Sequence, residues 1–302
     1  MTKDKKDLSD FFANTRQEER WFLKMHGLEN YFAIFDSRYQ SFDPSISEII
    51  KICDPENGIN VDQVIIIQNP TKLGLDNNAA VFMRILNVDG REAEACGNAT
   101  RCLAWALMKN MNTKKIRIET LAGVLDCYLI ENDWVKCHMG KISMKPDDIP
   151  LSKNINTLNA DINIGPLTDA VITNIGNPHI TFFVDDLDDI DIEKWAPKIQ
   201  MNNLFPEQVN VGVAEIIDMN NLRLKVFERG AGLTAACGSG ACVAVYAAFK
   251  RKLIANKKIN VILPAGNMII ELGDDDNALM SGPVSYLHSG LWDHAEYNKT
   301  NH

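Results

Sequence analysis

The chain has 302 residues, of which 46% are hydrophobic and 24% are charged, and its formal net charge is −9. A chain of this length can bury more than one hydrophobic core, so we expect about two domains. The acidic balance, without a basic cluster, argues against nucleic acid or an anionic membrane as a partner. No apolar run approaches the ~18 residues of a membrane span, and no secretory signal is expected.

Residues 1–20 carry charges of both signs, and we predict a solvated extension there, with a helical turn around Leu8 to Phe12. From Trp21 the chain consists of short runs rich in β-branched and aromatic residues, separated by Gly, Asn, Asp and Pro, which is typical of strands. These runs are WFLKMHG, YFAIFDS, VIIIQNP and AVFMRILNVDG, and later IRIETLAG, VLDCYLI and WVKCHMG. A helix is predicted between the two groups, over Gly97 to Asn110.

Two short stretches share the frame Ala-Cys-Gly, and the frame contains Cys96 in one and Cys237 in the other: EACGNATRC (94–102) and AACGSGAC (235–242). Each is followed by a run that is apolar on every face, CLAWALM and ACVAVYAAF, which is typical of a helix surrounded by other structure. Each cysteine is therefore predicted at a helix N-terminus, where free N–H groups can stabilise a thiolate and bind a carboxylate. The alternative is that both are buried structural cysteines.

The order of landmarks repeats along the chain. Gly27–Asp36 aligns without gaps with Gly176–Asp185, and Cys96 aligns with Cys237. We therefore predict an α+β fold of two pseudo-repeated domains, each a curved, mostly antiparallel β-sheet or barrel around one central helix. The expected boundaries are an N-terminal extension over 1–20, domains over 21–137 and 138–278, and a C-terminal tail over 291–302.

The cysteine spacings do not favour a metal site. Seven cysteines, an odd number, fit reduced thiols in the cytoplasm. The spacings C-x5-C and C-x4-C lack the paired C-x2-C of zinc sites, so no metal is expected. The acidic stretch VDDLDDIDIE (184–193) lacks the glycine of a calcium loop and the spacing of its terminal glutamate, and we predict a solvated loop or helix start.

Two thiols on equivalent helices could approach one small molecule from opposite sides, which is the arrangement of a two-base racemase or epimerase. His179 in GNPH and Glu228 in ERGAG could accept the thiol protons. A hydrolase using Cys96 and His179 would leave the second motif unexplained, and a non-catalytic binding protein would need neither cysteine. His179 could also be a purely structural histidine.

Several further segments, taken with the two Cys-Gly motifs, resemble the diaminopimelate epimerase family over residues 21 to 290. They are KMHGLENYF (24–32), GINVDQ (58–63), NVDG (87–90), GNPH (176–179), FPEQVNV (205–211) and ERGAG (228–232). The resemblance implies a pyridoxal-phosphate-independent isomerase that interconverts LL- and meso-diaminopimelate in lysine and peptidoglycan synthesis. It implies no cofactor, a small-molecule substrate as the partner, and a tendency to form a homodimer. It also implies that a strand at about 279–290 returns to complete the first domain.

The resemblance implies roles for individual residues. The catalytic thiols fall on Cys96 and Cys237, and the residues that tune them fall on His179 and Glu228. Amides and a guanidinium suit a ligand with two amines and two carboxylates, although the asparagines could also be turn residues. The implied substrate contacts are Asn30, Gln63, Asn87, Gly97, Asn98, Asn177, Asn210, Glu228, Arg229, Gly238 and Ser239.

The chain departs from the family pattern at four positions near these contacts. The family usually has Gly at 29 and 60, Asp at 31 and a polar residue at 233, where this chain has Glu29, Asn60, Tyr31 and Leu233. The shape of the pocket could differ there. A related two-cysteine racemase, such as a proline-racemase-like enzyme, is the alternative function, but the amide-rich contacts and ERGAG favour the epimerase.

Overall fold

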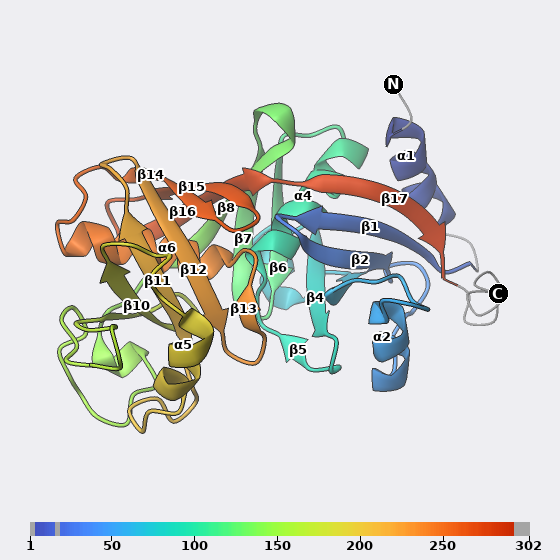
Figure 1. Ribbon diagram of the computed structural model, residues 1–302. Coiled ribbons are helices and arrows are strands. Elements are labelled where there is room, and N and C mark those ends of the chain that lie inside the picture. Colours follow the sequence, from blue (N-terminus) through green and yellow to red (C-terminus); the bar gives the residue numbers. More distant parts are fainter. Residues whose placement is uncertain (1–3, 16–18, 293–302) are drawn as a thin grey trace. The chain divides into compact units, whose positions relative to one another are not determined.

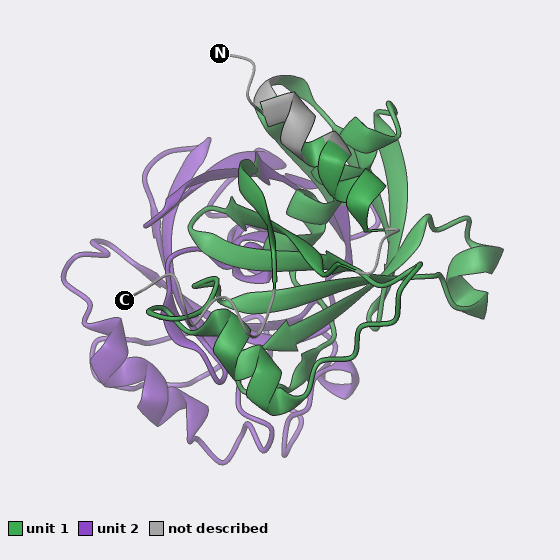
Figure 2. Ribbon diagram, turned by 90° about the vertical axis from the view of Figure 1, so that its right-hand side faces the viewer, with its two compact units in different colours: residues 1–137, 283–302 green, residues 138–282 purple. Residues whose placement is uncertain are grey.

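The computed structural model describes residues 4–15 and 19–292, so part of the expected extension and residues 293–302 of the expected tail lie outside it. The chain divides into two compact units (Figure 2). Unit 1 contains residues 1–137 and 283–302, and unit 2 contains residues 138–282.

Unit 1 is a sheet with one buried helix and three further helices (Figure 1). Its last strand, β17, pairs with β1, so the first and last strands of the described residues meet in this unit. The helices are α1 (Asp4–Asn14), α2 (Ile46–Cys53), α3 (Lys72–Asp76) and α4 (Gly97–Asn110). The strands are β1 (Trp21–Gly27), β2 (Asn30–Asp36), β3 (Gln63–Gln68), β4 (Val81–Asn87), β5 (Glu92–Ala93), β6 (Lys115–Thr120), β7 (Gly123–Leu129), β17 (Ser285–Leu291) and the first half of β8 (Trp134–Lys141), which continues into unit 2.

One helix start in unit 1 follows directly from its sequence, whereas one hairpin turn does not. Ser45 accepts a hydrogen bond from the Glu48 amide and so starts α2, as N-cap serines commonly do. The β1–β2 hairpin has a two-residue turn, Leu28 and Glu29, with φ of 54° and 59°. Such turns need positive φ at both positions and usually contain Gly or Asn. This hairpin therefore forms with two residues that disfavour its backbone conformation.

The N-terminal segment corrects the prediction of a solvated extension. It forms helix α1 over Asp4–Asn14, which contacts β1, β17 and α4. Phe11 is fully buried and Phe12 and Leu8 are 7% and 6% exposed. Among the charged residues of this segment, Leu8, Phe11 and Phe12 form an apolar side. Their spacing of i, i+3 and i+4 places them on one face of a helix.

Unit 2 contains the second group of strands and the helix that they surround (Figure 1). Its core includes Phe182, Val211 and Val213, together with residues of α5. Its helices are α5 (Ile192–Gln200) and α6 (Gly238–Lys250). Its strands are β9 (Val171–Asn174), β10 (Pro178–Val184), β11 (Asn210–Ile216), β12 (Asn221–Glu228), β13 (Gly232–Thr234), β14 (Lys258–Leu263), β15 (Gly266–Leu272) and β16 (Asn277–Pro283).

The two units repeat one pattern of strand pairing. In unit 1, β2–β3 and β4–β6 are parallel, whereas β3–β4, β4–β5, β6–β7 and β7–β8 are antiparallel. In unit 2, β10–β11 and β12–β14 are parallel, and β11–β12, β12–β13, β14–β15 and β15–β16 are antiparallel. The predicted duplication of an α+β unit is therefore confirmed at the level of topology.

Each sheet surrounds its central helix. Helix α4 contacts β1, β2, β6 and β7, and α6 contacts β9, β10, β11, β12, β14 and β15. Every residue of α4 from Asn98 to Met108 is buried, which confirms the prediction for the apolar run Cys102–Met108. The polar residues Asn98, Thr100 and Arg101 are buried as well. The predicted bounds Gly97 to Asn110 are also confirmed.

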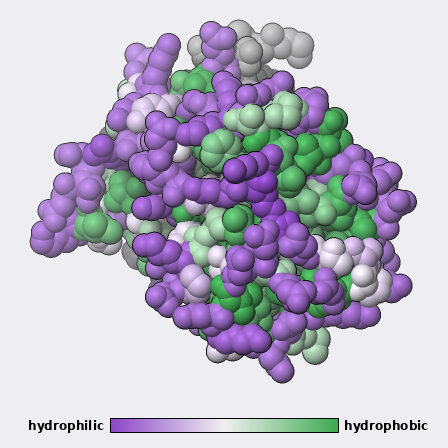
Figure 3. All heavy atoms as spheres, turned by 90° about the vertical axis from the view of Figure 1, so that its left-hand side faces the viewer, coloured by the Kyte–Doolittle hydropathy of each residue, from purple (hydrophilic) through white to green (hydrophobic). Residues whose placement is uncertain are grey.

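The surface is mixed in character. Figure 3 shows one face of the molecule, on which hydrophobic side chains form several groups between hydrophilic ones. Within the described residues, no helix has the length and apolar character needed to cross a membrane.

Candidate active site

The first half of the candidate site centres on Cys96 in unit 1. Cys96 has extended backbone angles and is the N-cap of α4, with its carbonyl oxygen accepting the first helical hydrogen bond from the Thr100 amide at 2.9 Å. Its thiol is half-buried. The next residue, Gly97, begins the helix, so the thiol lies beside amide groups that have no partner within the helix.

Amide side chains from two elements surround Cys96. The Asn98 Nδ2 donates to Asn30 Oδ1 at 3.3 Å, and the Cys96 Sγ lies 3.8 Å from the same oxygen. The Asn30 Nδ2 in turn donates to Asp62 Oδ2 at 3.1 Å. The predicted residues Asn30, Cys96 and Asn98 are thus in direct contact.

A second amide pair lies across neighbouring strands of unit 1. Gln63 is the first residue of β3 and Asn87 the last of β4, and their backbones pair directly. The Gln63 Nε2 donates to Asn87 Oδ1 at 2.8 Å. The Gln63 Oε1 is buried without a hydrogen-bond partner, so it is an acceptor that a ligand could satisfy.

The second half centres on Cys237 in unit 2. Cys237 is the N-cap of α6, and Gly238 is the first helical residue. The Cys237 Sγ accepts a hydrogen bond from the Gly240 amide at 3.4 Å and lies 3.5 Å from Ser239 Oγ. Unlike Cys96, it is buried.

Burial changes the expected chemistry of Cys237. Burial, and then the charge of Glu228, raise the pKa of the Cys237 thiol well above its ordinary value, against the hydrogen bonds from Ser239 and Gly240. The Gly240 amide at the helix N-terminus favours the Cys237 thiolate, as expected, but desolvation outweighs it, so the thiol form is favoured overall.

Glu228, the last residue of β12, is the titratable neighbour of Cys237. Thr234 Oγ1 donates to Glu228 Oε1 at 2.6 Å. Burial raises the pKa of the Glu228 carboxyl, and hydrogen bonds with Thr234 and Cys237 partly offset this. A carboxyl with a raised pKa is a stronger base than an ordinary one, which suits proton exchange with a thiol.

His179 on β10 reaches the same helix end through Ser239. Its Nε2 lies 3.0 Å from Asn177 Oδ1 and 3.1 Å from Ser239 Oγ. Burial, and then the charge of Arg229, lower the pKa of the His179 imidazole to about 3. The imidazole is therefore neutral at physiological pH.

Asn210 and Arg229 have mainly local partners. The Asn210 Nδ2 donates to the Pro178 carbonyl at 3.0 Å and its Oδ1 accepts from the Arg229 amide at 2.9 Å, so this buried side chain ties β10 to the end of β12. The exposed Arg229 guanidinium donates to the Glu207 carbonyl at 3.0 Å.

The strand registers show which site residues correspond between the units. Phe32 pairs with Gln63, the first residue of β3, and His179 pairs with Asn210, the first residue of β11. This corrects the ungapped sequence alignment by two residues, because Gly27 is the last residue of β1, whereas Gly176 lies inside the β9–β10 turn, two residues after the end of β9 at Asn174. The corresponding pairs are Asn30 and Asn177, Phe32 and His179, Gln63 and Asn210, Asn87 and Glu228, Cys96 and Cys237, and Asn98 and Ser239.

The correspondence shows a chemical difference between the two halves. Where unit 2 has the titratable groups His179 and Glu228, unit 1 has Phe32 and Asn87. Both of the predicted thiol-tuning residues therefore belong to unit 2, together with Cys237.

Sequence reasoning missed three polar residues that contact the site. Asp62 accepts a hydrogen bond from Asn30, and Thr234 donates one to Glu228. Arg101 donates to Asn98 Oδ1 at 2.9 Å. Asp62 and Arg101 both lie inside quoted motifs, GINVDQ and ACGNATRC. Their inclusion in these motifs was the only available signal.

Two departures from the family pattern keep the backbone that glycine would have. Glu29 and Asn60 have φ of 59° and 58°, the left-handed region that glycine adopts without cost. At the third departure, the Tyr31 amide donates to Asp62 Oδ2 at 2.7 Å. The fourth, Leu233, is 41% exposed on β13.

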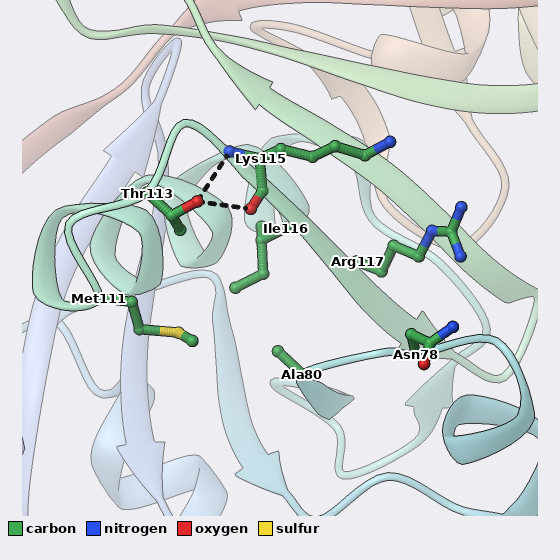
Figure 4. Close-up of a pocket in the computed structure, with 7 residues that line it drawn as sticks. All are labelled: Asn78, Ala80, Met111, Thr113, Lys115, Ile116 and Arg117. Carbon is green, nitrogen blue, oxygen red and sulfur yellow. Dashed lines mark hydrogen bonds between the residues drawn. The ribbon is translucent and has the colours of Figure 1, made fainter.

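A separate hollow in unit 1 does not belong to the site. It is lined by residues that include Met111, Thr113 and Lys115 (Figure 4). Met111 follows the last residue of α4, whereas Cys96 precedes the first. A helix of 14 residues separates the two ends by about 20 Å.

Comparison with known structures identifies the fold class. A PhzF-family phenazine biosynthesis protein from Bacillus anthracis matches with a TM-score of 0.65 at 16% identity, covering 92% of this chain and all of that one. A hydroxyproline epimerase from Agrobacterium vitis matches with a TM-score of 0.64 at 13% identity, covering 91% of both chains. The protein thus has the duplicated α+β fold of this class.

Comparison with known sequences identifies the family. The sequence model of diaminopimelate epimerase matches residues 22–145 and 171–287. The diaminopimelate epimerase of Acidiphilium cryptum is 41% identical over 276 residues, covering 91% of this chain and 97% of its own. That of Rhodospirillum centenum is 38% identical over 271 residues, covering 90% and 91%. The chain belongs to the diaminopimelate epimerase family.

Proposed function

We propose that the protein interconverts LL- and meso-diaminopimelate by a two-base mechanism, as a step of lysine and peptidoglycan precursor synthesis. The observation that carries this proposal is the position of Cys96 and Cys237, each the N-cap of the central helix in its own unit. Two thiols at corresponding positions of a duplicated fold are needed by a two-base isomerase, and a one-thiol hydrolase would not need the second. Sequence identity of 36–41% to diaminopimelate epimerases also favours this function over that of a proline-racemase-like enzyme.

In the proposed reaction both thiols reach one α-carbon. A thiolate removes the α-proton, so the C–H bond breaks and an S–H bond forms. The second thiol then gives its proton to the opposite face, and a new C–H bond forms as its S–H bond breaks. The proton count of enzyme and substrate is unchanged, and the reverse reaction exchanges the two roles.

The energetic demand explains the number of polar groups. If the α-proton is ten or more pK units less acidic than a thiol, its removal costs at least ~14 kcal/mol. One oxyanion-type donor supplies about 3–4 kcal/mol, so several donors must act together. The amides at the starts of α4 and α6 can hold the substrate carboxylate and stabilise the charge that develops on it.

The titratable groups of unit 2 are proposed to tune the thiols. Glu228 exchanges a proton with Cys237, since the two interact and both pKa values are raised by burial. His179 remains neutral, and its hydrogen bond with Ser239 positions the residue beside Cys237. The remaining predicted contacts, Asn30, Gln63, Asn87, Gly97, Asn98, Asn177, Asn210, Arg229, Gly238 and Ser239, are proposed to bind the substrate.

Four further parts of the proposal come from the sequence: activity without pyridoxal phosphate, activity without metal, a homodimer, and a cytoplasmic location. Light scattering of the purified protein tests the dimer, and cell fractionation tests the location.

The test of the proposed function is an assay with pure LL-diaminopimelate in heavy water. The enzyme is first dialysed against a chelator and a carbonyl reagent. Formation of the meso isomer with deuterium at the α-carbon is expected. A folded protein that forms no meso isomer would contradict the proposed function, and activity that needs added pyridoxal phosphate would contradict the cofactor-independent mechanism. The Cys96→Ser variant is the control for contaminating epimerase.

A further inference from the structure

Arg101 is a fully buried cation on α4, for which the proposed mechanism has no role. Its side chain has no exposed surface and is among the largest buried side chains of the protein. Placing a charge in the interior is costly unless polar groups receive it. One such group is Asn98, whose Oδ1 accepts from Arg101 Nη2 at 2.9 Å.

The hydrogen bonds that start at Arg101 have one direction. A guanidinium can only donate, so the atom of Asn98 that faces it must be the oxygen. The Asn98 Nδ2 then donates to Asn30 Oδ1, and the Asn30 Nδ2 donates to the Asp62 carboxylate. A carboxylate can only accept. The donor-only Arg101 at one end and the acceptor-only Asp62 at the other therefore fix the orientation of both amides. We call these four residues the amide chain.

The amide chain determines which atom faces the thiol of Cys96. The Cys96 Sγ lies 3.8 Å from Asn30 Oδ1, an oxygen that accepts hydrogen bonds. If Asn30 were reversed, its NH2 group would face the sulfur instead, and a thiolate rather than a thiol would be favoured. The direction of the chain thus bears on the protonation of Cys96.

The corresponding position of unit 2 is held differently. There Ser239 corresponds to Asn98, and its hydroxyl contacts His179. Unit 1 has Phe32 in place of His179, so no partner can come from that strand position. The fifth residue of α4 is Arg101, where α6 has Cys242. In unit 1 the second helix residue, Asn98, is thus bonded to Arg101 of the same helix, whereas in unit 2 the corresponding Ser239 is bonded to His179.

The end of β1 leaves space for the guanidinium. A Cβ atom on Gly27 would lie 3.2 Å from Arg101 Nη2 and 3.3 Å from the Asn98 carbonyl oxygen, both tighter than ordinary contacts. The absence of a side chain at Gly27 therefore lets the Arg101 guanidinium pack against the β1–β2 hairpin, which carries Asn30.

We infer that Arg101 and Asp62 are positioning residues, which fix the direction of the amide chain from its two ends and so present the Asn30 carbonyl oxygen to the Cys96 thiol. This inference rests on the proposed function for its effect on catalysis. Its effect on the reactivity of Cys96 can be measured without any turnover.

The test is a double-mutant cycle of Arg101→Met and Asp62→Asn. Alkylation of Cys96 by iodoacetamide is followed by mass mapping from pH 6 to 10, and kcat and KM are measured with LL-diaminopimelate. Release of either end lets Asn30 turn its NH2 group toward the sulfur, so each single variant should quicken alkylation below the thiol pKa by about tenfold, the equivalent of one pKa unit. Both variants should lower kcat.

The double variant distinguishes a connected amide chain from two charges that act independently on Cys96. Once one end is released the amides can reorient, so the second substitution should add less than it does alone, with a coupling of about 0.4 pKa unit or more. The matched control cycle is Arg117→Met and Asp126→Asn, an ion pair of unit 1 on β6 and β7 with an N···O distance of 2.9 Å. The control variants should leave Cys96 alkylation unchanged.

Two results would overturn the inference: single variants within twofold of the parent in alkylation and kcat, or fully additive effects at Arg101 and Asp62. If Arg101→Met does not fold, Arg101→Lys carries the test, because it keeps the charge and loses the planar fork. It should lower kcat at least threefold, and an unchanged kcat would refute the role of the fork. A parent that does not epimerise would refute the proposed function, while the alkylation cycle would still decide the inference.

Discussion

The buried imidazole of His179 predicts a specific loss of stability in mild acid. His179 is 1% exposed, and burial together with Arg229 lowers its pKa from an ordinary 6.5 to about 3. In the unfolded chain the imidazole takes up a proton below pH 6.5, whereas in the folded chain it does not until about pH 3. The group therefore contributes stability above pH 6.5, and this contribution is lost as the pH falls toward 3.

The magnitude follows from the two pKa values. At pH 5 the unfolded imidazole is almost fully protonated, and 1.5 pH units below 6.5 correspond to about 2 kcal/mol at 1.36 kcal/mol per unit. The whole interval of about 3.5 units corresponds to about 5 kcal/mol at pH 3 or below. Replacing His179 by Gln removes the titrating group and keeps an amide that can bond to Ser239 and Asn177.

The assay is urea unfolding at pH 8 and pH 5 for the parent and for His179→Gln. Other titrating groups cancel in the comparison, so the parent should lose about 2 kcal/mol more than the variant between these pH values. Equal losses in parent and His179→Gln would refute the reasoning.

Five other substitutions have definite expected outcomes. Cys96→Ser and Cys237→Ser should each lose epimerisation by several orders of magnitude and retain α-hydrogen exchange from opposite isomers; equal exchange of both isomers by either variant would exclude a two-thiol mechanism. Glu228→Gln removes a charge that raises the pKa of Cys237, so Cys237 should alkylate faster at pH 8 while epimerisation slows; slower alkylation would contradict this coupling. Phe11→Ala should cost about 3–5 kcal/mol in urea unfolding, because the ring is fully buried; a cost below about 1 kcal/mol would mean that α1 contributes little to the core. Glu29→Gly should stabilise the chain by about 1 kcal/mol, because residue 29 has a left-handed backbone, and a lower melting temperature would contradict the strain.

Much of the architecture could be predicted from local patterns. The apolar runs after Cys96 and Cys237 predict two buried helices, and both are present as α4 and α6. The strand runs between Trp21 and Gly140 match β1 to β4 and β6 to β8. These features depend on periodicity and on turn residues, which single sequences carry well.

Other features depend on contacts that no local pattern contains. Helix α1 is rich in charge, and its burial depends on strands far away in the sequence. The ungapped alignment is wrong by two residues because Gly27 ends a strand and Gly176 lies within a turn, a difference that the sequence alone does not show.

The candidate site shows the same division. The motifs predict which side chains gather at each cysteine, and Asn30 and Asn98 do meet at Cys96. The raised pKa of Cys237 could not be predicted from its helix position, because the depth of burial decides the sign. Asp62 and Arg101 were missed because their roles come from hydrogen-bond direction, which spacing does not encode.

The pairing of β17 with β1 has a consequence for synthesis on the ribosome. Unit 2 is one continuous segment, residues 138–282, and can fold as soon as it leaves the exit tunnel. Unit 1 cannot close until Ser285–Leu291 is made, because until then β1 lacks its partner on that side. At about 5–20 residues per second, translation of unit 2 takes roughly 7–30 s. Throughout that delay the nascent N-terminal half exposes an unpaired sheet edge, which is a site for aggregation or for the binding of a chaperone.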